Sequence, residues 1–532
     1  MHSAIESTPQ AAEPEEFSAA HVVSLLQSKD AQIEGLQQQL EVLKHRVAWF
    51  ERQVFGSKSE RYAVQADPAQ LQLGEVAAGA APVAEPRTSV PAHTRRVSRA
   101  VDASEVDESK FFDESRVPVQ TIVVPNPAAA GLATHEYEVI GEKVSYRLAQ
   151  RPGSYLVLKY VRQVVKRKDT QELTCAAAPS GVMEGSRADV SFVAGMLVDK
   201  FAWHLPLYRQ HQRLDASGIT VSRPWLTQLS QRAIGLLTPI YQAQLESIRA
   251  SRVKAMDETP IKAGRTGHGK MKQAYYWPVY GDRDEICFAW FPTRAGLHVR
   301  QALGLTQGED SVLLTDGYAA YASYAKKVGV THAQCWTHSR RCFFEALASN
   351  PQGVDEALKQ IGALYDIEEQ IRELKLSGQS KRLHRLTHSK PRVDEFFDWV
   401  DQQFQAQGLL PSSPFTQALN YVRARQLGLE VFLSDPDVPI DTNHLERALR
   451  VVPMGRRAWL FCWTELGAEQ VGIIQSLITT CRVQGIDPYT YLVDVLQRVG
   501  QHPAARVAEL TPRLWKQHFA PNPLRSDLTL AA

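Results

Sequence analysis

The sequence predicts a multidomain protein of mixed α+β and α/β class, in which a helical insertion interrupts a sheet-containing core. At 532 residues the chain exceeds what one hydrophobic core supports, so it divides into roughly three or four domains. Its apolar spacing changes along the chain from heptads to strand-like alternation and to helical periodicity. An apolar content of 44% and a charged content of 22% are ordinary for globular proteins.

Charge and cysteine usage limit the partners and the cellular compartment that the sequence allows. A net charge of +2 excludes a polycation, so a nucleic acid must meet local basic patches. The patch from Lys143 to Lys168 fits a phosphate-tracking surface and a solvated face equally well. The six cysteines lack paired C-x-x-C spacing, the N-terminus is acidic, and no apolar run approaches the ~18 residues that cross a bilayer. We therefore expect a soluble, cytoplasmic protein with reduced thiols and no membrane partner.

The N-terminal part is predicted to associate with a second copy. After a disordered segment over 1–18, residues 19–57 form a heptad seam, which predicts a leucine-zipper-like coiled coil and a homo-oligomer. The seam runs through Leu26, Ile33, Leu40, Val47 and Val54. A single amphipathic helix packed on its own protein is the alternative. A basic turn with the candidate DNA contacts Lys58 and Arg61 follows, and residues 58–117 read as a flexible linker.

Two modules are expected between the linker and the core. Alternating apolar residues over 118–184 predict a small sheet-containing module. Residues 185–245 read as a helix-turn-helix-like DNA-binding region with Gly218 in its turn. Ser222 is the expected cap of the second helix and Arg223 a candidate DNA contact. A helix pair that does not bind DNA remains open.

Residues 250–345 show the element order β-β-β-α-β-α-β, which is that of the ribonuclease-H-like fold. The expected elements cover 253–257, 273–282, 285–293, 295–305, 311–316, 318–329 and 331–336. Asp257 closes the first strand and Asp316 the fourth, so neighbouring strands would present both carboxylates side by side. Such a pair is costly unless a divalent cation binds it. Oxygen ligands favour Mg²⁺ or Mn²⁺ over zinc.

A third carboxylate is expected on a later helix that crosses the sheet. The segment 441–450, DTNHLERALR, can begin with Asp441 as its cap and supplies Glu446. Asn443, Glu446, Arg447 and Arg450 share one face of this helix. Arg447 and Arg450 are placed there to hold phosphates, and Asn443 is a supporting candidate. A surface helix with ion pairs along it is the alternative. Three carboxylates that hold metal ions can activate a water or a 3′-hydroxyl for displacement at phosphorus.

The remaining segments complete the predicted domain plan. Residues 346–435 are too many for one strand and one helix, and their periodicity predicts a helical insertion that flanks the site. Residues 436–482 form the second part of the core with the Glu446 helix, and 483–532 form a C-terminal module.

Several motifs in combination resemble transposases of the insertion-sequence-66 family. They are RQVFGSKSER at 52–61, HLPLYRQHQ at 204–212, MDETPI at 256–261, TDGYAAY at 315–321, CWTHSRRCFF at 335–344, DTNHLERALRVVPMGRRAWLF at 441–461 and GIDPYTYLVDVL at 485–496. The resemblance implies a DNA transposase of the D-D-E type with Asp257, Asp316 and Glu446 as its catalytic, metal-binding triad. Element ends and target DNA are the implied partners, together with small accessory transposition proteins. Supporting or DNA-contacting candidates in these motifs include His338, Arg340, Arg341, Arg456 and Arg457.

One departure from the family concerns zinc. Members usually carry a cysteine-rich zinc module before the helix-turn-helix, but residues 118–178 hold only Cys175 and His135 as nitrogen or sulfur ligands. Zinc needs four ligands, so we expect no zinc there. Cys335 reads as core. Two other functions stay open: a catalytically silent DNA-binding protein derived from a transposase, and a ribonuclease-H-like nuclease without joining activity.

Overall fold

A computed structural model describes residues 111–530, except for short gaps at 113–114, 116, 131–132, 134–135, 152, 180, 184, 268–269, 306–307, 309, 407, 460–461 and 463. The predicted disordered segment, the coiled coil and residues 58–110 lie outside these residues, as do Lys58 and Arg61. Folded structure begins by residue 111, ahead of the predicted boundary at 118. Phe111 and Phe112 are both buried, and the Thr220 N–H donates to the Phe111 carbonyl at 2.8 Å.

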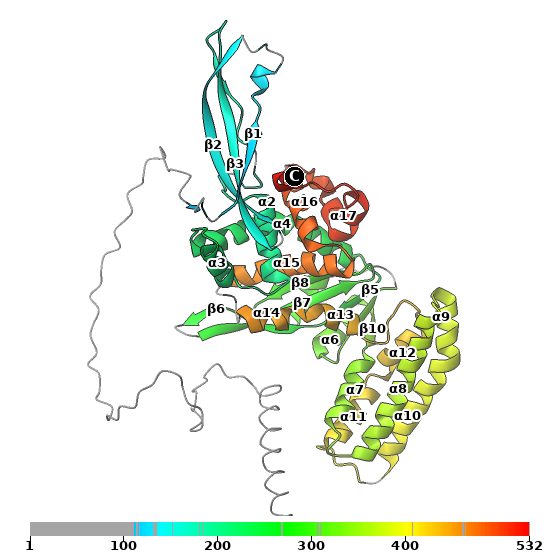
Figure 1. Cartoon of the computed structure of the whole chain (residues 1–532). Helices are drawn as coiled ribbons and strands as arrows, with labels where there is room; N and C mark the ends of the chain where they lie inside the picture. Colours follow the sequence, from blue (N-terminus) through cyan, green and yellow to red (C-terminus); the bar gives the residue numbers. More distant parts are fainter. Residues whose placement is uncertain are drawn as a thin grey trace, which may run out of the picture. The chain divides into compact units, whose positions relative to one another are not determined.

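The first sheet is built on a long hairpin (Figure 1). Strands β2 (Tyr137–Arg151) and β3 (Ser154–Arg167) pair antiparallel, and β1 (Val119–Val124) and β4 (Leu173–Cys175) also pair with β3. Gly153 sits in the turn with a φ of 85°, a conformation that favours glycine. Part of one face packs on Leu528 near the C-terminus, where the Tyr160 hydroxyl donates to Asp527 at 2.7 Å. The predicted strands of this region are confirmed.

A set of helices follows the first sheet. Helix α2 (Val190–Phe201) is mostly buried, whereas α3 (Leu207–Ala216) buries only two of its residues. Gly218 turns the chain with a φ of 83°, and α4 (Arg223–Arg249) begins after Ser222, whose hydroxyl accepts the Trp225 N–H at 3.3 Å. The predicted helix pair, its glycine turn and its serine cap are therefore confirmed.

The central sheet has the order β10-β9-β5-β7-β6, with β8 also paired to β7. Its strands are β5 (Val253–Met256), β6 (Thr259–Gly267), β7 (Lys270–Gly281), β8 (Glu285–Phe291), β9 (Val312–Thr315) and β10 (Thr331–Gln334). β5 and β6 both pair antiparallel to β7, whereas β9 and β10 run parallel to β5. The antiparallel pairing of β7 and β8 around the turn at 281–284 was expected. Strand β6 was not.

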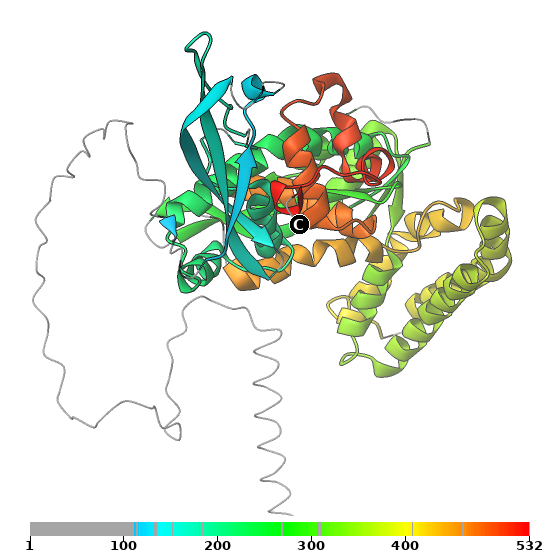
Figure 2. The same cartoon turned by 45° about the horizontal axis from the view of Figure 1, so that its top comes forward.

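Helices cover both faces of this sheet (Figure 2). Helices α5 (Leu297–Leu303) and α6 (Ala319–Val328) pack in the core cluster on one face, and α15 (Glu465–Val483) packs in the cluster on the other. Helix α4 contributes buried residues to both clusters. Strand β8 leaves backbone groups unpaired, and hydroxyls of α15 fill part of that gap. The Ser476 hydroxyl accepts the Phe288 N–H at 2.8 Å, and that of Thr480 accepts the Ile286 N–H at 3.1 Å.

The expected helical insertion between α7 (Trp336–Glu345) and the Glu446 helix is present (Figure 1). It contains α8 (Pro351–Glu373), α9 (Gly378–His384), a π-helical turn (Arg385–Ser389), α10 (Lys390–Gln405), α11 (Pro414–Arg423) and α12 (Gln426–Ser434). The chain continues through α13 (Asn443–Leu449), α14 (Val451–Trp459), α16 (Pro488–Arg498) and α17 (Pro512–His518). Within the described part of the chain, every helix is too short or too polar to span a membrane.

Candidate active site

Two neighbouring strands carry the first two acids at their carboxyl ends. Strands β5 and β9 run parallel with Ala255 opposite Leu314, and Asp257 and Asp316 each follow that pair by two residues. Adjacent strands lie about 4.8 Å apart, so the chain leaves the sheet at both acids side by side. The prediction that these two strands are neighbours is confirmed.

The third acid reaches the same edge because the segment before its helix is tied to the end of β10. The Trp336 N–H donates to the Ile440 carbonyl at 3.2 Å. The N–H and the hydroxyl of Thr442 both donate to the Cys335 sulfur at 3.3 Å. Helix α13 starts directly afterwards and carries Glu446 in its first turn. Cys335 is thus a core residue, as predicted, and it also positions the helix.

Asp441 extends this tie, although it does not occupy the cap position predicted for it. The N-cap of α13 is Thr442, whose side chain makes no capping bond. One residue earlier, the Asp441 carboxylate accepts the N–H of Asn443 at 3.0 Å and its side-chain amide at 2.6 Å. It also accepts the Thr337 hydroxyl at 3.2 Å, and that hydroxyl pairs with Tyr365 of α8 at 2.8 Å. The helical insertion therefore helps to hold the Glu446 helix.

The acids share one electrostatic environment. Burial raises the pKa of Asp257 to about 7, and repulsion from Glu258, Asp316 and Glu446 adds to that rise. Glu446 faces two basic groups at distances too long for hydrogen bonds: His338 Nε2 at 3.8 Å and Arg341 Nη2 at 3.9 Å. Burial lowers the pKa of His338 despite the acids around it. The local negative charge is therefore only partly balanced by the protein.

The acids do not converge on one point: among the described residues, no three His, Cys, Asp or Glu side chains are close enough to hold a metal ion. Their oxygens are nevertheless the type of ligand that a divalent cation takes. Oδ1 of Asp257 accepts the N–H of the next residue at 2.7 Å, and Oδ1 of Asp316 accepts the Tyr318 N–H at 2.9 Å. Both carboxylates keep a second oxygen for other ligands. Glu446 Oε1 is buried without a hydrogen-bond partner. Free carboxylate oxygens suit Mg²⁺ or Mn²⁺.

The raised pKa of Asp257 predicts a stability effect in metal-free protein. Its folded-state pKa lies above the ordinary value of 3.8, so the stability it contributes is present below pH 4 and is lost as pH rises through 7. The loss is at most about 4–5 kcal/mol, since one pKa unit corresponds to about 1.4 kcal/mol. Asp257→Asn should therefore unfold at a higher temperature than the wild type at pH 8 in EDTA, and at a similar temperature at pH 4.

Asp398→Asn is the matched control for this measurement, because Asp398 is exposed on α10. Its melting temperature should follow that of the wild type at both pH values. If Asp257→Asn melts no higher than Asp398→Asn at pH 8, neither burial nor the neighbouring acids destabilise the ionised carboxylate of Asp257.

Comparison with known proteins adds to this geometry. A family model described as Transposase IS66 family matches residues 185–470, a span that holds all three acids and more than half of the chain. The chain belongs to the IS66 transposase family. Models for the IS66 C-terminal element and for the Transposase C of IS166 homeodomain match residues 476–513 and 42–104. Family membership implies a transposase with a DNA-binding region.

Relatives of this IS66 family member span nearly its whole length. An uncharacterised protein of Sinorhizobium fredii, y4hP, is 30% identical over 512 residues, which cover 90% of this chain and 89% of that protein. A second uncharacterised protein of the same species, y4jD, is 28% identical over 511 residues, which cover 91% of this chain and 96% of y4jD.

Exposed basic side chains of the transposase lie on the Glu446 helix and on helices α7 and α14, and Arg341 of α7 faces Glu446. Those exposed on α7 and on the segment of α13 and α14 are Arg340, Arg341, Arg447, Arg450 and Arg457. Two other candidates are engaged inside the protein. The amide of Asn443 donates to Asp441 at 2.6 Å, and the guanidinium of Arg456 donates to the Pro260 carbonyl of β6. Burial also lowers the pKa of Arg456.

The loop after Asp316 is held by a residue that no local pattern selects. Arg425, 108 residues later, donates to the Gly317 carbonyl at 3.0 Å and stacks on the Tyr421 ring at 3.8 Å. A Cβ on Gly317 would lie 2.6 Å from the guanidinium and 2.7 Å from that ring, so a side chain there would displace Arg425 or Tyr421. No periodicity links two residues so far apart in the chain.

The predicted DNA-contacting region before the core is described in part. Arg223, the first residue of α4, is exposed and its guanidinium lies 4.6 Å from the centre of the Tyr208 ring. In the basic patch, Arg147 donates to the Pro179 carbonyl and Arg162 to the Ala176 carbonyl. Arg167 pairs with Asp169. At least these three cations therefore have partners within the module. Cys175 lies half-buried on β4, and His135 is outside the described residues.

Proposed function

We propose that this chain is a D-D-E transposase, which cleaves DNA at the ends of its insertion sequence and joins those ends to target DNA with the help of a divalent cation. The observation that supports this most is the approach of three acids from distant parts of the chain to one edge of the sheet, where Asp316 and Glu446 both raise the pKa of Asp257. Asp257 and Asp316 leave adjacent parallel strands, and Glu446 adds its charge to theirs from α13. Membership of a transposase family is the second support.

The strand order supports a ribonuclease-H-like core as the scaffold of this site. Strands β5 and β6 together take the place of one strand broken at Asp257, because both pair with β7. The sheet then reads β8, β7, β5/β6, β9, β10. In this order β7 is antiparallel to the strands on both sides of it, and β9 and β10 are parallel to β5. The helical insertion falls between β10 and the Glu446 helix.

Each residue at the edge has a distinct part in the proposed reaction. Asp257, Asp316 and Glu446 would hold Mg²⁺ or Mn²⁺, and that cation would supply activation of a water or a 3′-hydroxyl and stabilisation of the leaving oxygen. Arg341, 3.9 Å from Glu446, can bind a phosphate that approaches the acids. His338 has a lowered pKa, and it therefore stays neutral near pH 7 and does not replace the cation as a partner for Glu446.

The other exposed arginines, on α7, α13 and α14, extend this basic rim for the DNA backbone. Self-association through residues 19–57 would bring two element ends together, and small accessory transposition proteins would act with the dimer. Both features remain predictions from the sequence.

The test is a joining assay with the full chain. Purified protein, Mg²⁺ and labelled DNA taken from the two flanks of its own gene should give joined products with a second plasmid, and scrambled DNA of equal length should not. Nicking of both DNAs without joining would identify a nuclease instead. Specific binding of the flanks with no product at any cation concentration would identify a catalytically silent DNA-binding protein.

A further inference from the structure

An arginine stands at the edge of the acid cluster, held by a fourth carboxylate. Glu258 follows Asp257 directly, and its side chain is only 4% exposed. Oε1 of Glu258 accepts both Nε and Nη2 of Arg294, with Nε at 2.7 Å. Oε2 accepts the Tyr321 hydroxyl at 2.5 Å. Glu258 is thereby saturated with partners, unlike the three acids proposed to bind the cation.

A second set of contacts ties the same arginine to Asp316. The Arg294 guanidinium lies over the Tyr318 ring at 4.4 Å, and the Tyr318 hydroxyl donates to the Arg294 carbonyl at 2.7 Å. The backbone N–H of Tyr318 donates to Oδ1 of Asp316 at 2.9 Å. Tyr318 therefore contacts the catalytic acid through its backbone and the arginine through its ring and hydroxyl. Glu258, next to Asp257, and Tyr318, which contacts Asp316, together fix the position of Arg294 relative to the acids.

Part of this guanidinium remains available to a ligand. The side chain of Arg294 is 48% exposed, and no hydrogen bond from a described residue engages its Nη1. A planar guanidinium with one edge fixed and the other free is well suited to a phosphate oxygen, because less side-chain freedom is lost on binding.

Arg294 and Arg341 lie on opposite faces of the sheet. Successive residues of a strand point to opposite faces. Glu258 reaches Tyr321 of α6, which covers one face. Glu446 belongs to α13, whose Leu445 packs in the other cluster. A DNA strand that crosses the edge at Asp257 and Asp316 would meet Arg341 from one side and Arg294 from the other.

We infer that Arg294 binds a backbone phosphate of the DNA strand that lies across the acids, and that Glu258 and Tyr318 are positioning residues for it. This inference rests on the proposed function and names a substrate contact of the same site. A purely structural role, in which Arg294 only neutralises buried Glu258, is the alternative that the experiment must separate. The salt dependence of DNA affinity separates the two roles. The slope of log affinity against log salt concentration counts phosphate contacts, and an internal ion pair adds nothing to it.

The experiment measures binding of a labelled duplex from the flank of the gene, in Mg²⁺, across a salt series. Each phosphate contact contributes about 0.9 to the slope of log affinity against log salt concentration. Arg294→Ala should weaken binding about tenfold and lower the slope by about 0.9, as expected for one lost charge-assisted contact. Arg294→Lys should restore the slope with only part of the affinity.

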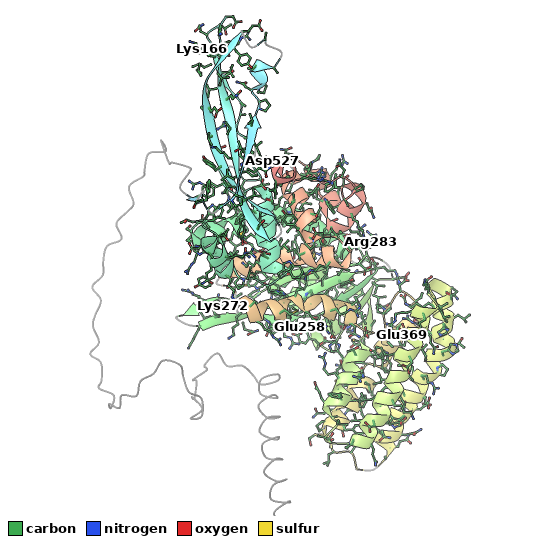
Figure 3. All side chains as sticks on the ribbon, in the orientation of Figure 1. Lys166, Glu258, Lys272, Arg283, Glu369 and Asp527 are labelled. Carbon is green, nitrogen blue, oxygen red and sulfur yellow. The ribbon has the colours of Figure 1, made fainter. Side chains whose placement is uncertain are left out.

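Arg283→Ala is the matched control. Arg283 is exposed in the turn after β7, and Gly281 at that end of β7 pairs with Lys254 at the start of β5, away from Asp257. Figure 3 shows Arg283 and Glu258 at separate places in the fold. Arg283→Ala should leave affinity and slope unchanged. If Arg294→Ala does not fold, Arg294→Ala combined with Glu258→Gln removes the unpaired carboxylate and carries the same test.

The outcomes separate this inference from the proposed function. A slope equal to that of the wild type in Arg294→Ala overturns the inference, even where its melting temperature falls. An Arg294-dependent slope in a protein that never joins DNA supports the inference and overturns the proposed function. A wild-type protein that binds neither flank DNA nor scrambled DNA overturns both.

Discussion

Asp316→Asn is expected to lower DNA joining by about 10³-fold or more while leaving the fold intact. A bound cation contributes several kcal/mol of charge stabilisation in phosphoryl transfer, and each 1.4 kcal/mol is about tenfold in rate. Asparagine keeps the Oδ1 that accepts the Tyr318 N–H, so the loop should retain its shape. Only the negative charge and a strong cation ligand are lost. The measurement is single-turnover joining of flank DNA in Mg²⁺, with circular dichroism as the check on folding.

Glu446→Gln should behave in the same way, because it removes the charge whose Oε1 is buried without a partner. Both variants should also lose most of the rise in melting temperature that Mg²⁺ gives the wild type, since a ligand stabilises only the state that binds it. Asp398→Asn, on the exposed face of α10, should retain activity and the Mg²⁺ effect. Joining by Asp316→Asn within threefold of the wild-type rate would remove Asp316 from the catalytic set.

Arg385→Met is expected to destabilise the fold by about 3–5 kcal/mol. Arg385 is fully buried in the π-helical turn and pairs with both carboxylate oxygens of Glu368, at 2.7 and 2.8 Å. Its Nη1 also donates to the carbonyls of Phe432 and Val438, at 2.8 and 3.0 Å. Removal of one partner from a buried ion pair leaves the other charge uncompensated. Denaturant unfolding of the full chain measures the effect.

Three comparisons make this prediction specific. Arg392→Met breaks the exposed Arg392–Glu395 pair, at 56% and 57% exposure, and should cost less than about 1 kcal/mol. The double variant Arg385→Met with Glu368→Met should be more stable than Arg385→Met alone, because no lone charge remains buried. In Arg385→Met, DNA-joining activity should be lost at denaturant concentrations well below the unfolding midpoint, because Val438 lies on the segment that leads to Glu446. Equal costs for Arg385→Met and Arg392→Met would show that the buried pair has no special weight.

Local patterns in the sequence predict most elements of the core. Apolar alternation locates β7, β8 and β9, and Gly218 with the Ser222 cap identifies the helix pair before the core. Strand β6 escapes this reasoning because Pro260 and Gly264 interrupt its pattern, and its stability comes from pairing with β7. The predicted cap, Asp441, lies one residue before the N-cap Thr442, and its carboxylate accepts hydrogen bonds from Thr337 and from the Asn443 N–H.

Some residues of the candidate site could be identified from local sequence patterns and others could not. Asp257, Asp316 and Glu446 could be selected from the sequence, because each acid sits at the end of a strand or on the polar face of a helix. Arg294 and Arg425 could not, since an arginine in a loop carries no local signal. Arg456 and Asn443 were supporting or DNA-contacting candidates from their motif, yet the folded chain engages both internally.

The sequence by itself determined which segments become strands and helices and where the acids stand on them, because backbone sterics and apolar periodicity act over a few residues. Only the tertiary structure decided which of those segments meet. Thr442 on the Cys335 sulfur, Arg385 on the Val438 carbonyl and Glu258 on Arg294 join residues 36 to 107 positions apart. Contacts of that range form only as the chain packs, when burial makes each polar group take a partner that packing brings near.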